Sequence, residues 1–141
     1  MEAYSLERFV EAQRWDYPAA LSEIKSGRKL SHWMWYIFPQ MRGLGTSNMA
    51  YKFGIAGLDE ARAYMAHPIL SNRLIEITEE LLKHKNKSAE DVFGYVDALK
   101  LKSSMTLFSL VSDEGSVFHL AIDQFFRGEV DLKTLELVNC N

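Results

Sequence analysis

Apolar residues recur at three- and four-residue spacing along most of the chain, which places them on one face of an α-helix. No run of alternating apolar and polar residues is long enough to form a sheet. The pattern predicts helices that begin near Leu6, Tyr17, Ser31, Leu58, Pro68, Ser88, Ser116 and Asp131. We therefore predict an all-α fold of short helices joined by tight turns.

The residues at the ends of these segments are typical of helix caps and helix ends. Serine and aspartate accept hydrogen bonds from first-turn N–H groups, proline suits a first turn, and glycine ends a helix. Pro18 and Pro68 are placed in first turns, candidate N-caps are Ser5, Ser31, Ser88, Ser116 and Asp131, and candidate ends are Gly27, Pro39 and Gly128. Residues 48–56 fit either a helix or extended chain, because Gly54 and Gly57 weaken both patterns.

Residues 96–112 carry apolar side chains on two opposed faces of a helical wheel. One face holds Val96, Leu99, Leu107 and Leu110, and the other holds Ala98, Leu101, Met105 and Phe108. A helix that is apolar on both sides is expected to lie between other elements. We predict a central buried helix at about residues 95–112, around which the other helices pack.

Size and composition fit one globular domain over residues 1–141. The chain is 48% hydrophobic and 25% charged, so it has enough apolar surface to build a core. The net charge of −3 argues against a general nucleic-acid binder, which needs a cationic surface.

Cysteine usage and apolar runs bear on the cellular compartment. Cys140 is the single cysteine, so the chain can form no internal disulfide and no cysteine-rich metal site. No apolar run has the length of a signal peptide or a membrane span, and no two histidines have the spacing of a helical metal pair. We expect a cytoplasmic protein with no membrane span, no metal and no cofactor.

An aromatic segment follows His32 and carries the most chemical information. It holds two tryptophans, a tyrosine and a phenylalanine within six positions, and Gln40 comes soon after it. Trp33, Trp35 and Tyr36 can stack a planar ligand, such as a base or nicotinamide, or they can fill the core. His32 is either a general acid or base or a hydrogen-bonded residue at a helix start. Because a six-residue apolar helix cannot bury every ring equally, we predict that His32 and at least one ring line a common cavity.

A glycine-containing loop follows this segment and has the ingredients of a phosphate cradle. Gly43 and Gly45 permit unusual backbone angles, so successive N–H groups can surround an anion, and Arg42 adds a positive charge. Ser47 completes the polar set. The same residues also fit a tight turn that requires glycine, and they match neither the Walker nor the Rossmann fingerprint.

Asp97, Lys100 and Ser104 form a narrow polar row between the two apolar faces of the central helix. The row is either a gap open to solvent or the floor of a pocket. Lys100 and Ser104 are one helical turn apart, so they also fit a Ser–Lys hydrolase pair. Ser103 lies on an apolar face, where its hydroxyl needs a partner such as the carbonyl one turn earlier.

Several strings resemble domain-of-unknown-function family 1810, a group of small bacterial proteins. The resemblance covers nearly the whole chain, and its most distinctive string is Ser-His-Trp-Met-Trp-Tyr-Ile-Phe-Pro-Gln at residues 31–40. Further matching strings are residues 6–13, 27–29, 43–45, 67–68, 91–94, 97 and 100–108. The resemblance implies a compact all-helical single domain that forms a superhelix akin to an α-horseshoe. It implies no activity, because the family has no established one.

The residues favour a cytosolic protein that binds a small polar or anionic ligand, such as a nucleotide or a phosphorylated metabolite, either as a binding protein or as an enzyme of unknown reaction. The candidate ligand-binding residues are His32, Trp33, Trp35, Tyr36, Gln40, Arg42, Gly43, Gly45, Ser47, Lys100 and Ser104. The alternative is an interaction module whose helical groove binds a protein or peptide partner. A ligand site would be an enclosed pocket, whereas a groove would expose a contiguous apolar patch.

Overall fold

The computed structural model describes residues 5–139, and this part of the chain forms eight helices. They are α1 (Glu7–Ser26), α2 (Met34–Ile37), α3 (Asn48–Lys52), α4 (Leu58–Ala66), α5 (Pro68–Leu82), α6 (Ala89–Ser109), α7 (Val117–Phe126) and α8 (Leu132–Asn139). The extended pairing within the described residues is an isolated parallel bridge between Met41 and Ile55. The all-α prediction is therefore confirmed, whereas Cys140 lies outside the described residues.

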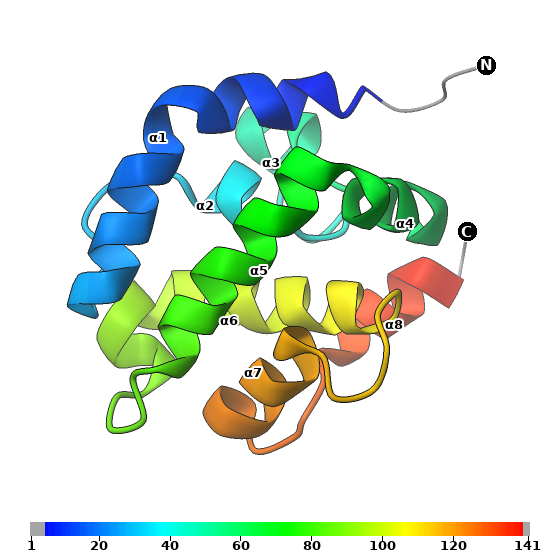
Figure 1. Cartoon of the computed structure of the whole chain (residues 1–141). Coiled ribbons are helices and arrows are strands. Elements are labelled where there is room, and N and C mark those ends of the chain that lie inside the picture. The colour runs from blue at the N-terminus through cyan, green and yellow to red at the C-terminus, as the bar shows by residue number, and fades with distance from the viewer. Residues whose placement is uncertain (1–4, 140–141) are drawn as a thin grey trace.

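Helix α1 is one continuous element, where the sequence pattern predicts two helices. Pro18 lies inside it and not in the first turn of a second helix. Proline removes one backbone hydrogen bond and crowds the carbonyl four residues earlier, so a helix that contains it can bend without ending. Figure 1 shows that α1 is bent along its length. Leu6 is the N-cap in place of Ser5, and Gly27 ends the helix with a φ of 84°.

Helices begin at or next to six of the predicted starts, and four of these have the predicted first-turn proline or capping residue. Pro68 occupies the first turn of α5. Ser88 Oγ accepts the N–H of Asp91 at 3.0 Å, and the Asp91 carboxylate accepts the N–H of Ser88 at 2.9 Å, which is a capping box at the start of α6. Ser116 caps α7, and the Asp131 carboxylate accepts a first-turn N–H of α8 at 3.1 Å.

Helix α6 is the central element of the fold, and α4, α7 and α8 pack against it. All residues from 103 to 109 are buried, which confirms the predicted central helix. The prediction of two buried faces is wrong for its N-terminal half, where Val96 and Leu99 are 63% and 50% exposed. The reason is that α8 packs beside the C-terminal half of α6 and leaves Val96 and Leu99 uncovered. Just before α8 begins, the backbone N–H of Asp131 donates to the Thr106 hydroxyl at 2.9 Å. Leu110, at the C-cap, is also 41% exposed.

The bounds of the central helix also differ from the predicted 95–112. The element begins at Ala89, but Gly94 inside it has a φ of 80° and a ψ of 168°, which interrupts the helical backbone. This left-handed φ favours glycine, because a side chain would be strained there. Continuous helix therefore resumes after Gly94 and ends at Ser109, three residues before the predicted end.

Residues 48–56 combine the two conformations that their sequence fits. Ser47 caps the short helix α3, and Ile55 then forms the extended bridge. Gly54 lets the chain after α3 pass close to Arg42, since a Cβ added at Gly54 would lie only 2.7 Å from the Cα of Arg42. The glycine loop is thereby held against the chain that follows α3.

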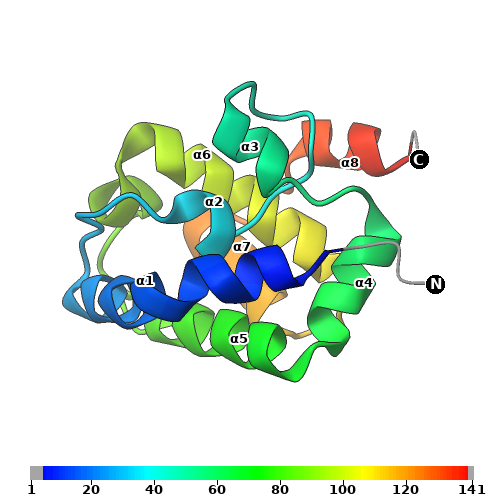
Figure 2. The ribbon, with the colours of Figure 1, turned by 90° about the horizontal axis from the view of Figure 1, so that it is seen from above.

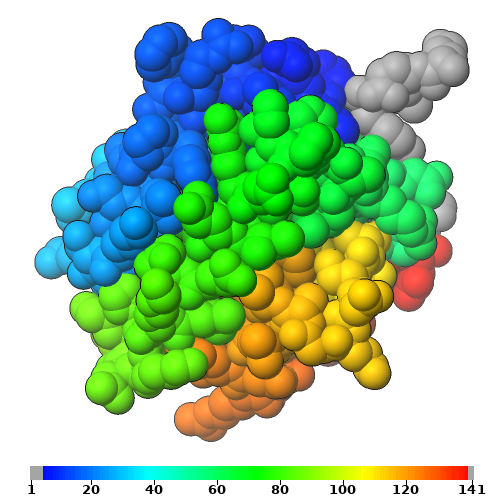
Figure 3. Space-filling model, in the orientation of Figure 1, coloured from blue at the N-terminus to red at the C-terminus, as the bar shows by residue number. Residues whose placement is uncertain are grey.

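Helix α5 crosses one face of the molecule between α1 and α7 (Figure 3). Figure 2 shows α5 on one side of the molecule and α3 and α8 on the opposite side, with α6 between them. No helix formed by residues 5–139 is both long and apolar enough to span a membrane.

Candidate functional site

The segment before α2 is held in place by one carboxylate of α1. Glu23 accepts hydrogen bonds from the N–H of Leu30 at 2.7 Å, from the N–H and hydroxyl of Ser31 at 3.0 and 2.6 Å, and from the indole of Trp33 at 2.9 Å. Partial burial opposes ionisation, but the hydrogen bonds outweigh it and lower the pKa of Glu23 to about 2. Ser31 therefore binds Glu23 and does not cap α2, whose N-cap is Trp33.

Trp33 and Tyr36 are core residues in the structure. The Trp33 ring is 1% exposed and packs with centroids 6.2 Å from Phe38 and 6.5 Å from Phe93. Tyr36 is 7% exposed and its hydroxyl donates to Asp16, so that burial and this hydrogen bond raise the pKa of Tyr36. Because the protein satisfies the polar atoms of both rings, neither ring offers a free hydrogen bond to a ligand.

His32 is exposed at the surface of the loop before α2. Its backbone carbonyl accepts the Tyr36 hydroxyl at 3.3 Å, whereas its imidazole has no hydrogen-bond partner within residues 5–139. The pocket that Trp35 lines does not include His32. The structure therefore does not bring His32 into this cavity with the aromatic rings.

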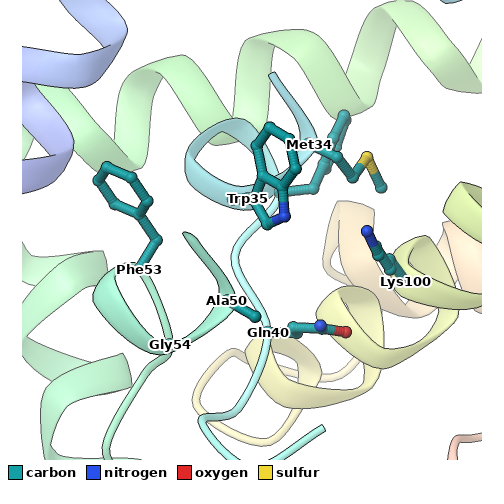
Figure 4. Close-up of a pocket in the computed structure, with 8 residues that line it drawn as sticks. Met34, Trp35, Gln40, Ala50, Phe53, Gly54 and Lys100 are labelled. Carbon is teal, nitrogen blue, oxygen red and sulfur yellow. The ribbon is translucent and has the colours of Figure 1, made fainter. Parts of the chain in front are cut away.

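Trp35 faces a cavity that lies between α2, α3 and α6 (Figure 4). We call it the Trp35 pocket, and its lining is Met34, Trp35, Phe38, Gln40, Ala50, Phe53, Gly54 and Lys100. The cavity leaves about 10 Å³ for the centre of a water molecule, so it holds only a small chemical group in this conformation. Of the predicted site residues, the structure brings Trp35, Gln40 and Lys100 together here.

Three polar groups surround this space. Figure 4 shows the indole nitrogen of Trp35 and the ammonium group of Lys100 directed towards it, with the Gln40 amide close by. Lys100 Nζ lies 5.5 Å from the centroid of the Trp35 ring. Within residues 5–139, neither the Trp35 indole N–H nor the Gln40 amide has a hydrogen-bond partner in the protein. Both groups are therefore available to a ligand or to water.

Asp97 determines the charge around Lys100. Its Oδ2 lies 2.9 Å from Lys29 Nζ, and its Oδ1 lies 3.5 Å from Lys100 Nζ. The Lys29 side chain is 8% exposed and also donates to the Ser31 carbonyl at 2.6 Å. One carboxylate thus serves two ammonium groups, and the three side chains together carry one net positive charge.

Ser104 is fully buried, and its hydroxyl has no hydrogen-bond partner among the described residues. It forms no hydrogen bond with Lys100, whose ammonium group pairs with Asp97 instead. Ser104 is also absent from the lining of the Trp35 pocket. In this conformation the two residues therefore do not form the Ser–Lys pair that their spacing allows.

Arg42 lies next to the pocket wall without lining it. Its guanidinium carbon is 4.8 Å from the centroid of the Tyr51 ring, and its Nη2 donates to the Gly54 carbonyl at 3.4 Å. The buried Nε has no hydrogen-bond partner within the described part of the chain. Arg42 thus supports the loop that carries Gly54 and does not point its charge into the cavity.

The other residues of the glycine loop have structural positions. Gly43 is exposed and has a φ of 106°, which favours glycine. Gly45 packs against α3, where an added Cβ would lie 2.7 Å from the Cβ of Ala50. Ser47 accepts the N–H of Ala50 at 3.1 Å as the cap of α3. The loop therefore supports one wall of the Trp35 pocket from outside.

Most of the apolar wall consists of residues that the sequence analysis does not select, namely Met34, Phe38, Ala50, Phe53 and Gly54. No local signal marks Phe53 as a neighbour of Trp35, because the turn after α3 brings it there. Asp97 and Lys100 both belong to the predicted polar row, and that row is the signal in the sequence for the ion pair beside the pocket.

Comparisons with known proteins agree with this fold. The chain is similar to a crystal structure described as the conserved hypothetical protein Rv1873 from Mycobacterium tuberculosis, with a TM-score of 0.95 and 41% sequence identity over 98% of this chain and 99% of that chain. No curated protein matches the chain. A family model described as "Protein of unknown function (DUF1810)" matches residues 3–138. The chain therefore belongs to the DUF1810 family, to which its aromatic segment already bears a resemblance.

Proposed function

We propose that the protein binds a small polar or anionic ligand in the Trp35 pocket. The observation that supports this most is the convergence of the Trp35 indole N–H, the Gln40 amide and the Lys100 ammonium group on one otherwise apolar cavity. Ligand sites typically combine apolar walls with a few polar groups. Two of these three groups have no partner in the described chain.

The local charge favours an anion over a cation or a neutral ligand. Lys29 and Lys100 share a single carboxylate, so one positive charge is left over beside the cavity. An ammonium group in partly dehydrated surroundings binds an anion through a charge-assisted hydrogen bond. The lining contains no nucleophile paired with a base, so we propose binding and not a reaction.

Thermal unfolding in the presence of an anion panel tests the proposal. The panel contains inorganic phosphate, AMP and short carboxylates, all at one ionic strength. We expect at least one anion to raise the melting temperature, because a ligand at about 100 times its Kd stabilises the native state by about 2.7 kcal/mol.

Two matched variants connect this effect to the pocket. Lys100→Met keeps the apolar stem and removes the charge, and it should abolish the rise. Lys102→Met makes the same change two residues away, outside the lining, and should preserve the rise. The proposal is wrong if no anion raises the melting temperature, or if both variants lose the effect equally.

An exposed apolar strip on α6 favours the second candidate function, a module that binds a protein or peptide partner. Tyr95, Val96 and Leu99 are 65%, 63% and 50% exposed, and their spacing places them on one side of the helix. Contiguous exposed apolar surface is typical of interaction sites. Sedimentation of the wild-type chain and of Leu99→Asp would show whether this strip drives association with a second copy.

A further inference from the structure

We infer that the Trp35 pocket distinguishes between anions. It selects a monoanionic carboxylate with a short apolar tail over a phosphate group. This inference rests on the proposed function, since it concerns the same pocket. It follows from the charge, the donor set and the size of the cavity.

The charge beside the pocket matches one negative charge. Asp97 already neutralises one of the two lysines, and the Lys29 ammonium group is occupied by Asp97 at 2.9 Å and by the Ser31 carbonyl at 2.6 Å. Lys100 is therefore the cation left for a ligand, and no arginine lines the cavity. A phosphate dianion would keep one uncompensated charge among apolar walls, which is unfavourable.

The donors suit the two oxygens of a carboxylate. One oxygen can accept from the Lys100 ammonium group, and the other can accept from the Gln40 amide or the Trp35 indole N–H. Phosphate sites in proteins typically use several backbone N–H groups or bidentate arginine. Here the backbone of the glycine loop lies outside the lining, and so does Arg42.

The size and the walls of the cavity favour a short apolar tail. The enclosed space leaves only about 10 Å³ for the centre of a water molecule, so it admits a group of a few atoms and not a drug-sized ligand. Met34, Phe38 and Phe53 supply the apolar surface. Burial of one methylene group raises affinity by about fourfold, so a tail that contacts this wall should bind more tightly than acetate does.

The indole N–H resonances of the chain provide a direct measurement, because each tryptophan has a different environment. Trp15 is 81% exposed, the Trp33 indole N–H is bound to Glu23, and the Trp35 indole N–H faces the pocket. The spectrum of the Trp35→Phe variant lacks one indole peak, and that peak is thereby assigned to Trp35. We would titrate the ¹⁵N-labelled protein with butyrate, butyramide and inorganic phosphate at constant ionic strength and pH 7.

We expect butyrate to move the Trp35 resonance in a saturable manner and to leave the Trp15 and Trp33 resonances in place. Phosphate and the neutral butyramide should each bind at least about tenfold more weakly than butyrate. Acetate should bind more weakly than butyrate by a factor of about four or more. Lys100→Met should weaken butyrate binding at least about tenfold, whereas Lys102→Met should not change it. An unchanged Trp33 resonance shows that each variant keeps the fold around Glu23.

The outcomes separate this inference from the proposed function. Phosphate that binds as tightly as butyrate overturns the selectivity and leaves an anion site in place. Butyramide that binds as tightly as butyrate overturns the role of the negative charge. Failure of every anion in the panel to move the Trp35 resonance overturns both the inference and the proposed function.

Discussion

The indole N–H of Trp33 donates a 2.9 Å hydrogen bond to Oε1 of Glu23, so a fully buried ring of the core is tied to a carboxylate of α1. The same carboxylate holds Leu30 and Ser31, and Lys29 lies 5.0 Å from the centroid of the Trp33 ring. Since Lys29 also pairs with Asp97, the loop before α2 is bonded at one end to α1 and at the other to α6. This arrangement sets the position of α2 and thus of Trp35.

Glu23→Gln should change how stability depends on pH. The folded-state pKa of Glu23, about 2, lies below its ordinary value of 4.5, so ionised Glu23 stabilises the fold above pH 4.5. That contribution is lost as the pH falls from about 5 to about 2. Urea unfolding of Glu23→Gln at pH 7 should show a loss of about 1–2 kcal/mol, and the difference from wild type should shrink at pH 3. An equal difference at both pH values would contradict the assigned role of the carboxylate.

Leu101→Ala should destabilise the protein far more than Leu99→Ala, although both leucines lie on α6. Leu101 is fully buried, so truncation leaves a cavity and costs about 2–5 kcal/mol. Leu99 is 50% exposed, and its truncation should cost less than about 1 kcal/mol. The free energy of unfolding in urea measures both changes. Similar losses for the two variants would mean that both faces of α6 are buried in solution.

The neighbouring serines of α6 should respond in opposite ways to alanine. Ser103 has the carbonyl partner predicted for it, as its hydroxyl lies 3.2 Å from the Leu99 carbonyl and 3.0 Å from the Asp131 carboxylate. Ser103→Ala should therefore cost about 0.5–1.5 kcal/mol. Ser104 buries a hydroxyl with no partner in the described chain, so Ser104→Ala should leave stability unchanged or raise it by up to about 1 kcal/mol. Thermal and urea unfolding check the sign, and a clear loss for Ser104→Ala would show that its hydroxyl has a partner.

Gly54→Ala should both destabilise the protein and disturb the Trp35 pocket. The added Cβ would lie 2.7 Å from the Cα of Arg42 and 2.9 Å from the Ala50 carbonyl, so the backbone must move, at a cost of about 1–3 kcal/mol. Gly115→Ala is the control, because its Cβ meets nothing within 4 Å and only the φ of 83° opposes the change. The Trp35 indole resonance should shift in Gly54→Ala and stay in place in Gly115→Ala.

Local sequence determined the helices and most of their starts. Pro68, Ser88, Ser116 and Asp131 mark helix starts because each acts through its own backbone or through N–H groups two or three residues away. Such interactions need no distant partner, so their positions can be predicted from the chain alone. Pro18 shows the limit, since packing of the apolar face of α1 holds one bent helix together across a residue that normally favours a break.

Tertiary structure alone decided which residues reach the candidate site. Ser31 binds Glu23 instead of capping α2, and His32 stays at the surface while Trp35 faces the cavity. Asp97 acquires Lys29 as a partner from a loop far away in the sequence. The physical reason is that the position of a residue in the helical repeat gives the direction of its side chain. The burial and the partners of that side chain depend on which elements pack beside the helix. The polar row of α6 was therefore visible in the sequence, whereas the pocket at its edge required the fold.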